Sequence, residues 1–151
     1  MRFGLFGGAK TKRADGPGDS HGYRDFIESS LHSNVSPEFW VQDGAPTTVR
    51  KRYLDGYSLH KLLEIYTIDD SGLASARDQD LNLRFCHEAG GYDMVVSADF
   101  GHGAISPLLR ESLIQSSPYL AVNTQANAGN GSMHTISKYA KADYISLTER
   151  E

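Results

Sequence analysis

A carboxylate at the end of a largely apolar run is the first candidate for chemistry in this sequence. Asp99 follows the run Met94–Ala98 and precedes Gly101-His102-Gly103. Because apolar residues are contiguous at the start of this run, we expect a strand that is buried on both faces. The glycines allow the chain to turn sharply and to approach a ligand closely, so Asp99 and this loop could contact a bound molecule. Alternatively, Asp99 caps the turn by accepting hydrogen bonds from backbone amides near Phe100, as Asp often does in turns. The sequence leaves both interpretations open.

A second group of candidates is cationic. In an extended segment, alternation places Thr48, Arg50 and Arg52 on one side, because successive side chains point to opposite faces. Two guanidinium groups on one face match the oxygens of a phosphate group, which arginine can bind in a bidentate way. The alternative is a solvated strand edge, where positive charge discourages aggregation.

Polar residues that follow other apolar segments form a third group of candidates. Three short apolar segments recur at intervals of roughly two dozen residues, the length of a right-handed crossover through a helix: residues 94–98, 119–122 and 143–147. Parallel strands have their carboxyl ends at one edge, where open α/β sheets bind ligands. We therefore expect Asp99, Asn123 and residues 148–151 to share one crevice, with His102 beside it.

An antiparallel hairpin would carry the arginines. Residues 47–55 and 62–68 are extended runs separated by Asp55-Gly56, a pair typical of hairpins. Residues 69–80 are polar and are predicted to form a linker.

Helices are predicted between the strands. Ser106-Pro107 is a helix start with a capping hydroxyl and a proline at the first helical position. Gly90-Gly91 is typical of the residues just past a helix end. Helical spacing of apolar residues predicts that Phe26, Leu108 and Tyr139 face the core. The predicted helical segments are residues 23–31, 81–89, 107–115 and 132–141, and a strand is predicted at residues 2–8.

Composition restricts the class of protein. The chain has 151 residues and a net charge of −4, and it has no run of Lys or Arg longer than residues 50–52, which argues against a nucleic-acid surface. Cys86 is the only cysteine, so no internal disulfide can form. No long apolar segment is present, and we expect one soluble, cytoplasmic domain that does not bind membranes.

Four segments in this order resemble the ribokinase-like (PfkB) carbohydrate kinases, in particular heptose-phosphate kinases and related sugar kinases, some fused to a nucleotidyltransferase. They are Thr47–Arg52, Val96–Gly103, Val122–Asn127 and Ala142–Ser146. The first is similar to the Thr-Thr-x-Lys/Arg-x-Arg pattern of the family's lid. The second is similar to its Ser-Asp-Tyr-Gly-Lys-Gly segment, with Phe100 and His102 substituted. The resemblance covers most of residues 23–151.

The resemblance implies an α/β fold: a ribokinase-like parallel sheet flanked by helices, with a small antiparallel hairpin as a lid, and incomplete. It implies a partial kinase domain over residues 1–151, with an N-terminal strand, loop and helix (1–46), the lid (47–68) and the α/β core (69–151). Arg50 and Arg52 would reach the phosphate of a sugar phosphate, and Asp99 would face the substrate. Asn123 would lie near the path of phosphate transfer.

The implied cofactors are ATP and Mg²⁺. Glu151 matches the Glu of the family's Asn-x-x-Glu motif, which helps organise magnesium, whereas Thr148 replaces the Asn. No Gly-Ala-Gly-Asp segment, which holds the family's catalytic base, occurs in the sequence, so no catalytic residue is assigned. We expect a fragment of a kinase that transfers the γ-phosphate of ATP to a sugar or sugar phosphate and is inactive by itself.

Two other functions remain open. One is a non-catalytic domain that binds a sugar phosphate or a protein partner. The other is an unrelated flavodoxin-like domain, which would have one uninterrupted parallel sheet and no separate hairpin. Because a lone two-stranded hairpin is marginally stable, we also expect a homodimer through the lid.

Overall fold

The computed structural model describes residues 3–7, 23–40, 46, 48–69, 71–126 and 134–149. The chain divides into two compact units. The first consists of Met1–Gly8 together with Asp70–Glu151, and the second is Ala9–Asp69. The N-terminal strand therefore belongs to the same unit as the predicted α/β core.

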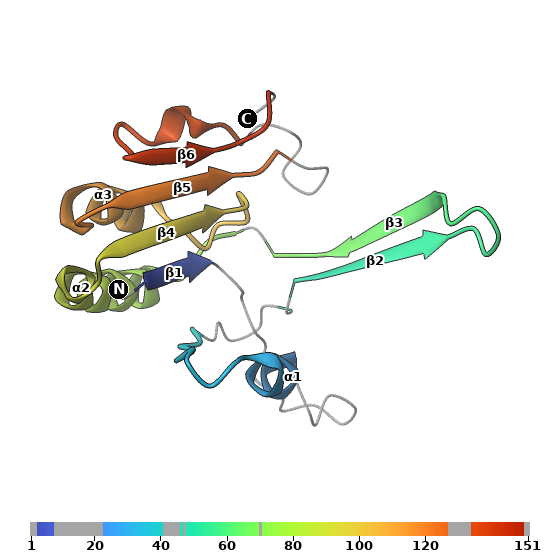
Figure 1. The fold of residues 1–151 in the computed structure, drawn as a ribbon, viewed down its shortest axis with the longest axis horizontal. Helices are drawn as coiled ribbons and strands as arrows, with labels where there is room; N and C mark the ends of the chain where they lie inside the picture. Colours follow the sequence, from blue (N-terminus) through green and yellow to red (C-terminus); the bar gives the residue numbers. More distant parts are fainter. Residues whose placement is uncertain are drawn as a thin grey trace. The chain divides into compact units, whose positions relative to one another are not determined.

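The first unit contains a four-stranded parallel sheet in the order β1-β4-β5-β6 (Figure 1). The strands are β1 (Phe3–Gly7), β4 (Met94–Asp99), β5 (Leu120–Thr124) and β6 (Tyr144–Ser146). The prediction of parallel strands linked by crossovers is confirmed. The chain is thus an α/β protein with a parallel sheet.

One face of this sheet carries the core. Val95 of β4 pairs with Leu120 of β5, and Ser97 pairs with Val122, so these buried side chains share a face. Met94, Val96 and Ala98, which alternate with them, are only half-buried. The contiguous apolar run predicted burial on both faces. Within the described part of this unit, helices pack against only one of these two faces.

Helices α2 (Ser75–Glu88) and α3 (Pro107–Ser116) pack on that face through Phe85, Leu109 and Leu113. The start of α3 is as predicted, since Ser106 Oγ accepts a hydrogen bond from the Leu109 amide at 3.0 Å. Leu108 is exposed, contrary to the prediction, because the neighbouring Leu109 occupies the buried side of the helix.

Two boundaries differ from the predictions. Helix α2 begins at Ser75, inside the predicted linker, because its first turns are polar and exposed and so show no apolar period. After Glu88 the chain adds one 3₁₀ turn, η1 (Ala89–Gly91).

The predicted helix 132–141 is wrong over its described part, which holds only the 3₁₀ turn η3 (Ile136–Lys138). Tyr139 after it is buried, as its apolar spacing predicted.

The second unit contains the predicted hairpin, formed by β2 (Val49–Leu54) and β3 (Lys61–Thr67), which pair antiparallel (Figure 1). Asp55 organises the connection, since its Oδ1 accepts from the amides of Tyr57 and Ser58 at 3.1 and 2.6 Å. The loop runs over residues 55–60 and is longer than the two-residue turn that Asp-Gly often forms.

Helix α1 (Tyr23–Ser30) lies in the second unit. Ile27 and Leu31, four residues apart, are half-buried, whereas Phe26 is 68% exposed. The prediction that Phe26 faces a core is therefore wrong. Its side chain points about 100° away from that of Ile27 around the helix axis. Among the described residues, no helix combines the length and the apolar character needed to cross a membrane.

Candidate functional site

The carboxyl ends of the parallel strands meet at one edge, as predicted. Asp99 at the end of β4 is in register with Thr124 of β5, and Asn123 is in register with Ser146 of β6. The predicted metal ligand Glu151 lies outside the described residues. This edge is the first candidate site.

The Asp99 side chain is held from two directions. It is 4% exposed. Its Oδ1 accepts a hydrogen bond from the Gly101 amide at 3.1 Å, and its Oδ2 accepts one from the Tyr139 hydroxyl at 2.9 Å. Since the Tyr139 proton goes to Asp99, its oxygen must accept the proton of Ser97 Oγ, 3.0 Å away. The bond to Gly101 is the turn cap that the sequence left open as an alternative.

His134 completes this buried network. Its Nε2 lies 3.0 Å from Asp99 Oδ1, and its Nδ1 lies 2.6 Å from Lys138 Nζ. The contact with Asp99 is a close electrostatic one rather than an aligned hydrogen bond. An ammonium group can only donate, so His134 Nδ1 accepts and the neutral ring carries its proton on Nε2, facing the carboxylate.

Burial lowers the pKa of His134 and outweighs the nearby Asp99 charge, which acts in the opposite direction. Lys138 and Arg110 lower this pKa further. Burial is also the largest cause of the raised pKa of Tyr139, over whose ring the Arg110 guanidinium lies at 5.9 Å from the centroid. The network is therefore built from a neutral histidine, a neutral tyrosine and one carboxylate.

These partners were missed by the sequence analysis. Tyr139 was predicted to point inward as an apolar residue, and the position of His134 gave no signal. Only the pairing of the end of β4 with residues 134–139 brings them to Asp99. The network fixes the start of the glycine loop, where Gly101 and Gly103 adopt φ values of 71° and 76° that disfavour residues with a Cβ.

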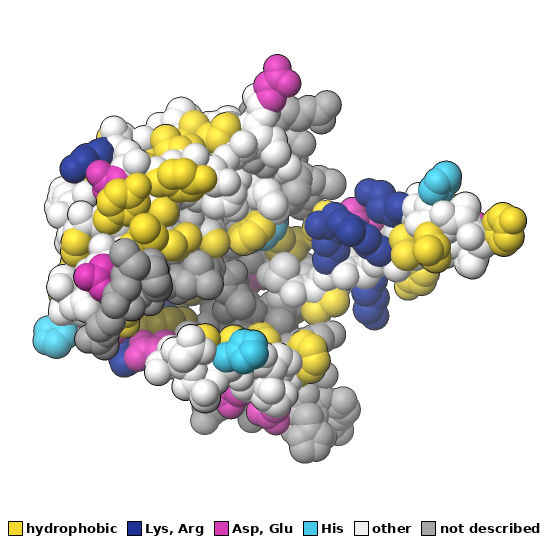
Figure 2. Space-filling view, in the orientation of Figure 1, with side chains coloured by type: hydrophobic (Ala, Val, Ile, Leu, Met, Phe, Trp, Pro, Cys, Tyr) yellow, Lys and Arg dark blue, Asp and Glu magenta, His cyan; other side chains and the backbone are white. Residues whose placement is uncertain are grey.

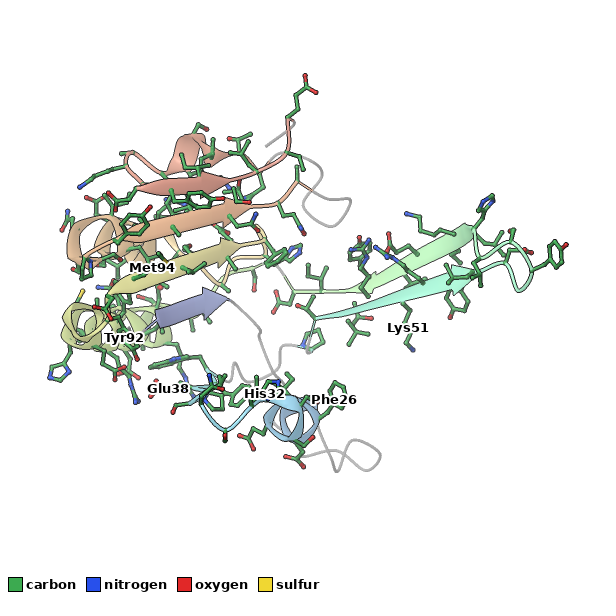
Figure 3. All side chains as sticks on the ribbon, in the orientation of Figure 1. Phe26, His32, Glu38, Lys51, Tyr92 and Met94 are labelled. Carbon is green, nitrogen blue, oxygen red and sulfur yellow. The ribbon has the colours of Figure 1, made fainter. Side chains whose placement is uncertain are left out.

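The other predicted residues of this edge are placed as follows. Asn123 is half-buried, and its Nδ2 donates to the Ser146 carbonyl at 2.8 Å, so it ties β5 to β6. His102 is half-buried in the glycine loop. A hollow of about 270 Å³ lined by His87, Glu88, Gly91 and Tyr92 lies at the other end of the sheet. Figure 3 shows Tyr92 and Met94 at that amino end.

The second candidate site is one face of the hairpin, where dark blue side chains gather in Figure 2. We call it the cationic face and define it by Arg50, Arg52, Lys61, Glu64 and Tyr66. Arg50 Nε and Arg52 Nε both donate to Glu64 Oε1, the second at 2.7 Å. The register places Arg50 and Arg52 on one face of the hairpin, whereas Thr48, which is half-buried, precedes the first residue of β2.

Charge is concentrated on this face. Three cations surround the Glu64 carboxylate, because Lys61 Nζ lies 3.3 Å from its Oε2, and the formal charge of the face is therefore about +2. The bond from Arg50 is the largest cause of the low pKa of Glu64, about 2, followed by the bond from Arg52. Arg50 also lies over the Tyr66 ring, 5.4 Å from its centroid. The two arginines are thus oriented by hydrogen bonds to Glu64 before any ligand binds.

The opposite face of the hairpin is mostly apolar and also carries Lys51. Tyr53 pairs with Leu63, and Lys51 pairs with Ile65. Tyr53, Leu63 and Ile65 are each between 44 and 53% exposed. Lys51 projects from β2 (Figure 3). Successive residues of the two strands therefore alternate between a cationic face and a mostly apolar face.

The described residues do not fit a magnesium site. Among them, no cluster of three or more His, Cys, Asp or Glu side chains could hold a metal ion. Asp99 directs both carboxylate oxygens to groups of its own chain.

Comparisons with known proteins do not identify the chain. It matches no family model, no curated protein and no solved structure. The resemblance to ribokinase-like kinases therefore stays a hypothesis.

Proposed function

We propose that this chain is a sugar-phosphate-binding part of a ribokinase-like carbohydrate kinase and that it does not catalyse phosphoryl transfer by itself. The observation that carries the proposal is the convergence of Arg50 and Arg52 on one face of the hairpin. Paired guanidinium groups suit the oxygens of a phosphate monoester, which carries close to two negative charges at neutral pH.

The arrangement of the fold supports this choice over the flavodoxin-like alternative. That alternative expects a single uninterrupted parallel sheet, whereas this chain has a two-stranded antiparallel hairpin in addition to its parallel sheet. The hairpin carries the cationic face, which is where a phosphorylated ligand would bind.

The state of Asp99 favours binding over catalysis. A general base must be within hydrogen-bond reach of the substrate hydroxyl whose proton it takes. Both oxygens of Asp99 accept hydrogen bonds from the chain, and the residue is buried. Asp99 would therefore shape the glycine loop, while phosphoryl transfer from ATP would depend on groups that the described residues do not supply.

Calorimetry on the full chain tests the binding proposal. We expect glucose 6-phosphate to bind more tightly than glucose. The double variant R50Q/R52Q should lose roughly tenfold or more of the affinity, as expected for charge-assisted hydrogen bonds. K51Q is the matched control, because it removes a charge from the opposite face, and it should change the affinity less than threefold. Equal binding of glucose, or equal losses in both variants, would contradict the proposal.

Two assays separate the binding role from catalysis. We expect no ADP release from ATP in the presence of sugar phosphates. Any heat on titration with ATP should disappear in R50Q/R52Q, because it would come from phosphate groups on the cationic face. Sustained ADP release would show that the chain is a working kinase and would contradict the proposal that it only binds the sugar phosphate.

A further inference from the structure

Glu64 organises the cationic face. Its carboxylate takes hydrogen bonds from the side chains of Arg50, Arg52, Lys61 and Tyr66. The Glu64 side chain is 9% exposed, whereas those of Arg50 and Arg52 are 41 and 53% exposed. The carboxylate thus lies beneath two guanidinium groups that still reach solvent.

The shared oxygen brings the two arginines together. Both bond to Oε1 through Nε, so their guanidinium groups converge although like charges repel each other. The Nη groups lie on the other edge of each guanidinium and can donate to a second anion. Such a preformed pair loses less conformational freedom on binding than two mobile side chains.

We propose that Glu64 is a positioning residue: it holds Arg50 and Arg52 together so that both bind one phosphate group of a phosphorylated sugar. This inference rests on the proposed function and deepens it.

Charge and positioning make opposite predictions for Glu64→Gln. The substitution raises the formal charge of the face from about +2 to about +3, so long-range attraction alone would tighten anion binding. If Glu64 positions the arginines, the neutral amide holds them less firmly and binding weakens. Glu64→Asp keeps the charge and shortens the side chain by one methylene. If only the charge of the face mattered, Glu64→Asp would leave the affinity for the anion unchanged. If Glu64 positions the arginines, Glu64→Asp weakens binding.

The experiment is calorimetric titration of the full chain with glucose 6-phosphate and with inorganic phosphate. We expect E64Q and E64D each to weaken binding by roughly fivefold or more, the size of a lost charge-assisted hydrogen bond. Glu88→Gln is the control, because it also removes one negative charge, from an exposed pair with Arg84 on α2. E88Q should stay within twofold. Tighter binding by E64Q, or an unchanged affinity in E64D, would overturn the inference.

A measurement on the unmodified chain covers the case in which a variant loses the hairpin. In ¹⁵N NMR spectra, the Nε–H signals of Arg50 and Arg52 should persist when glucose 6-phosphate binds, because Glu64 still accepts them. Loss of these signals on binding would show that the ligand displaces Glu64, and would overturn the inference. Absence of any binding by the unmodified chain would instead reject the proposed function, and this inference with it.

Discussion

Asp99 and His134 lie far apart in the sequence, yet His134 Nε2 is 3.0 Å from Asp99 Oδ1 and both side chains are buried. Lys138 contacts the other nitrogen of the ring, and Tyr139 donates to the other carboxylate oxygen. The end of β4 is thereby joined to residues 134–139. This contact makes Asp99 a structural centre of the carboxyl edge, and it yields predictions about stability.

Asp99→Asn should destabilise the chain by about 2–4 kcal/mol, because an amide cannot accept at both ends and leaves buried donors without a full partner. Urea unfolding at pH 7 measures this change. Asp80→Asn, on the exposed surface of α2, is the matched control and should stay within about 0.5 kcal/mol. An equally small effect at Asp99 would mean that its network adds little to stability.

His134 should make the chain sensitive to mild acid. Its pKa is lowered by burial in the folded state, so the unfolded state binds more protons once the pH falls below the unfolded value of about 6.5. The free energy of unfolding therefore keeps the full contribution of neutral His134 above the unfolded pKa. This contribution is lost as the pH falls through the lower pKa of the folded state. The charged groups that act on the ring are Asp99, Lys138 and Arg110.

Urea unfolding at pH 7, 6 and 5 checks this dependence. The free energy of unfolding should fall less steeply in His134→Gln than in the unmodified chain. His32→Gln, at an exposed position, should keep the original slope. The same slope in all three proteins would show that another group controls the response.

Ser106→Ala should cost about 1 kcal/mol, because it removes the side-chain acceptor for the Leu109 amide at the start of α3. Thermal unfolding measures the loss. Ser106→Asp provides an oxygen at the same position and should recover most of the stability. Failure of Asp to recover it would mean that the hydroxyl acts through another contact.

We propose that a second copy of the chain covers the apolar face of the hairpin, since a two-stranded hairpin is marginally stable by itself. Sedimentation at rising concentration should show a weak dimer. Leu63→Lys, within that face, should give a monomer. Tyr57→Lys changes an exposed aromatic residue of the loop and should leave the dimer intact. A monomer at every concentration would reject this interface.

Local patterns in the sequence were enough to predict the strands and their common edge. Apolar segments separated by helical lengths require parallel strands, and Asp99 and Asn123 then lie at neighbouring carboxyl ends. The hairpin followed from two extended runs around Asp55-Gly56. Each of these features depends on residues close together in the chain, where sterics and periodicity act directly.

The partners of the candidate residues were decided by tertiary structure. Register across β2 and β3 places Glu64 against Arg50 and Arg52, and chain packing brings His134 and Tyr139 to Asp99. The exposure of Phe26 likewise depends on what packs against its helix. A residue's type sets what it can donate or accept, but only long-range packing determines which group meets it and whether water is excluded, and these decide its chemistry.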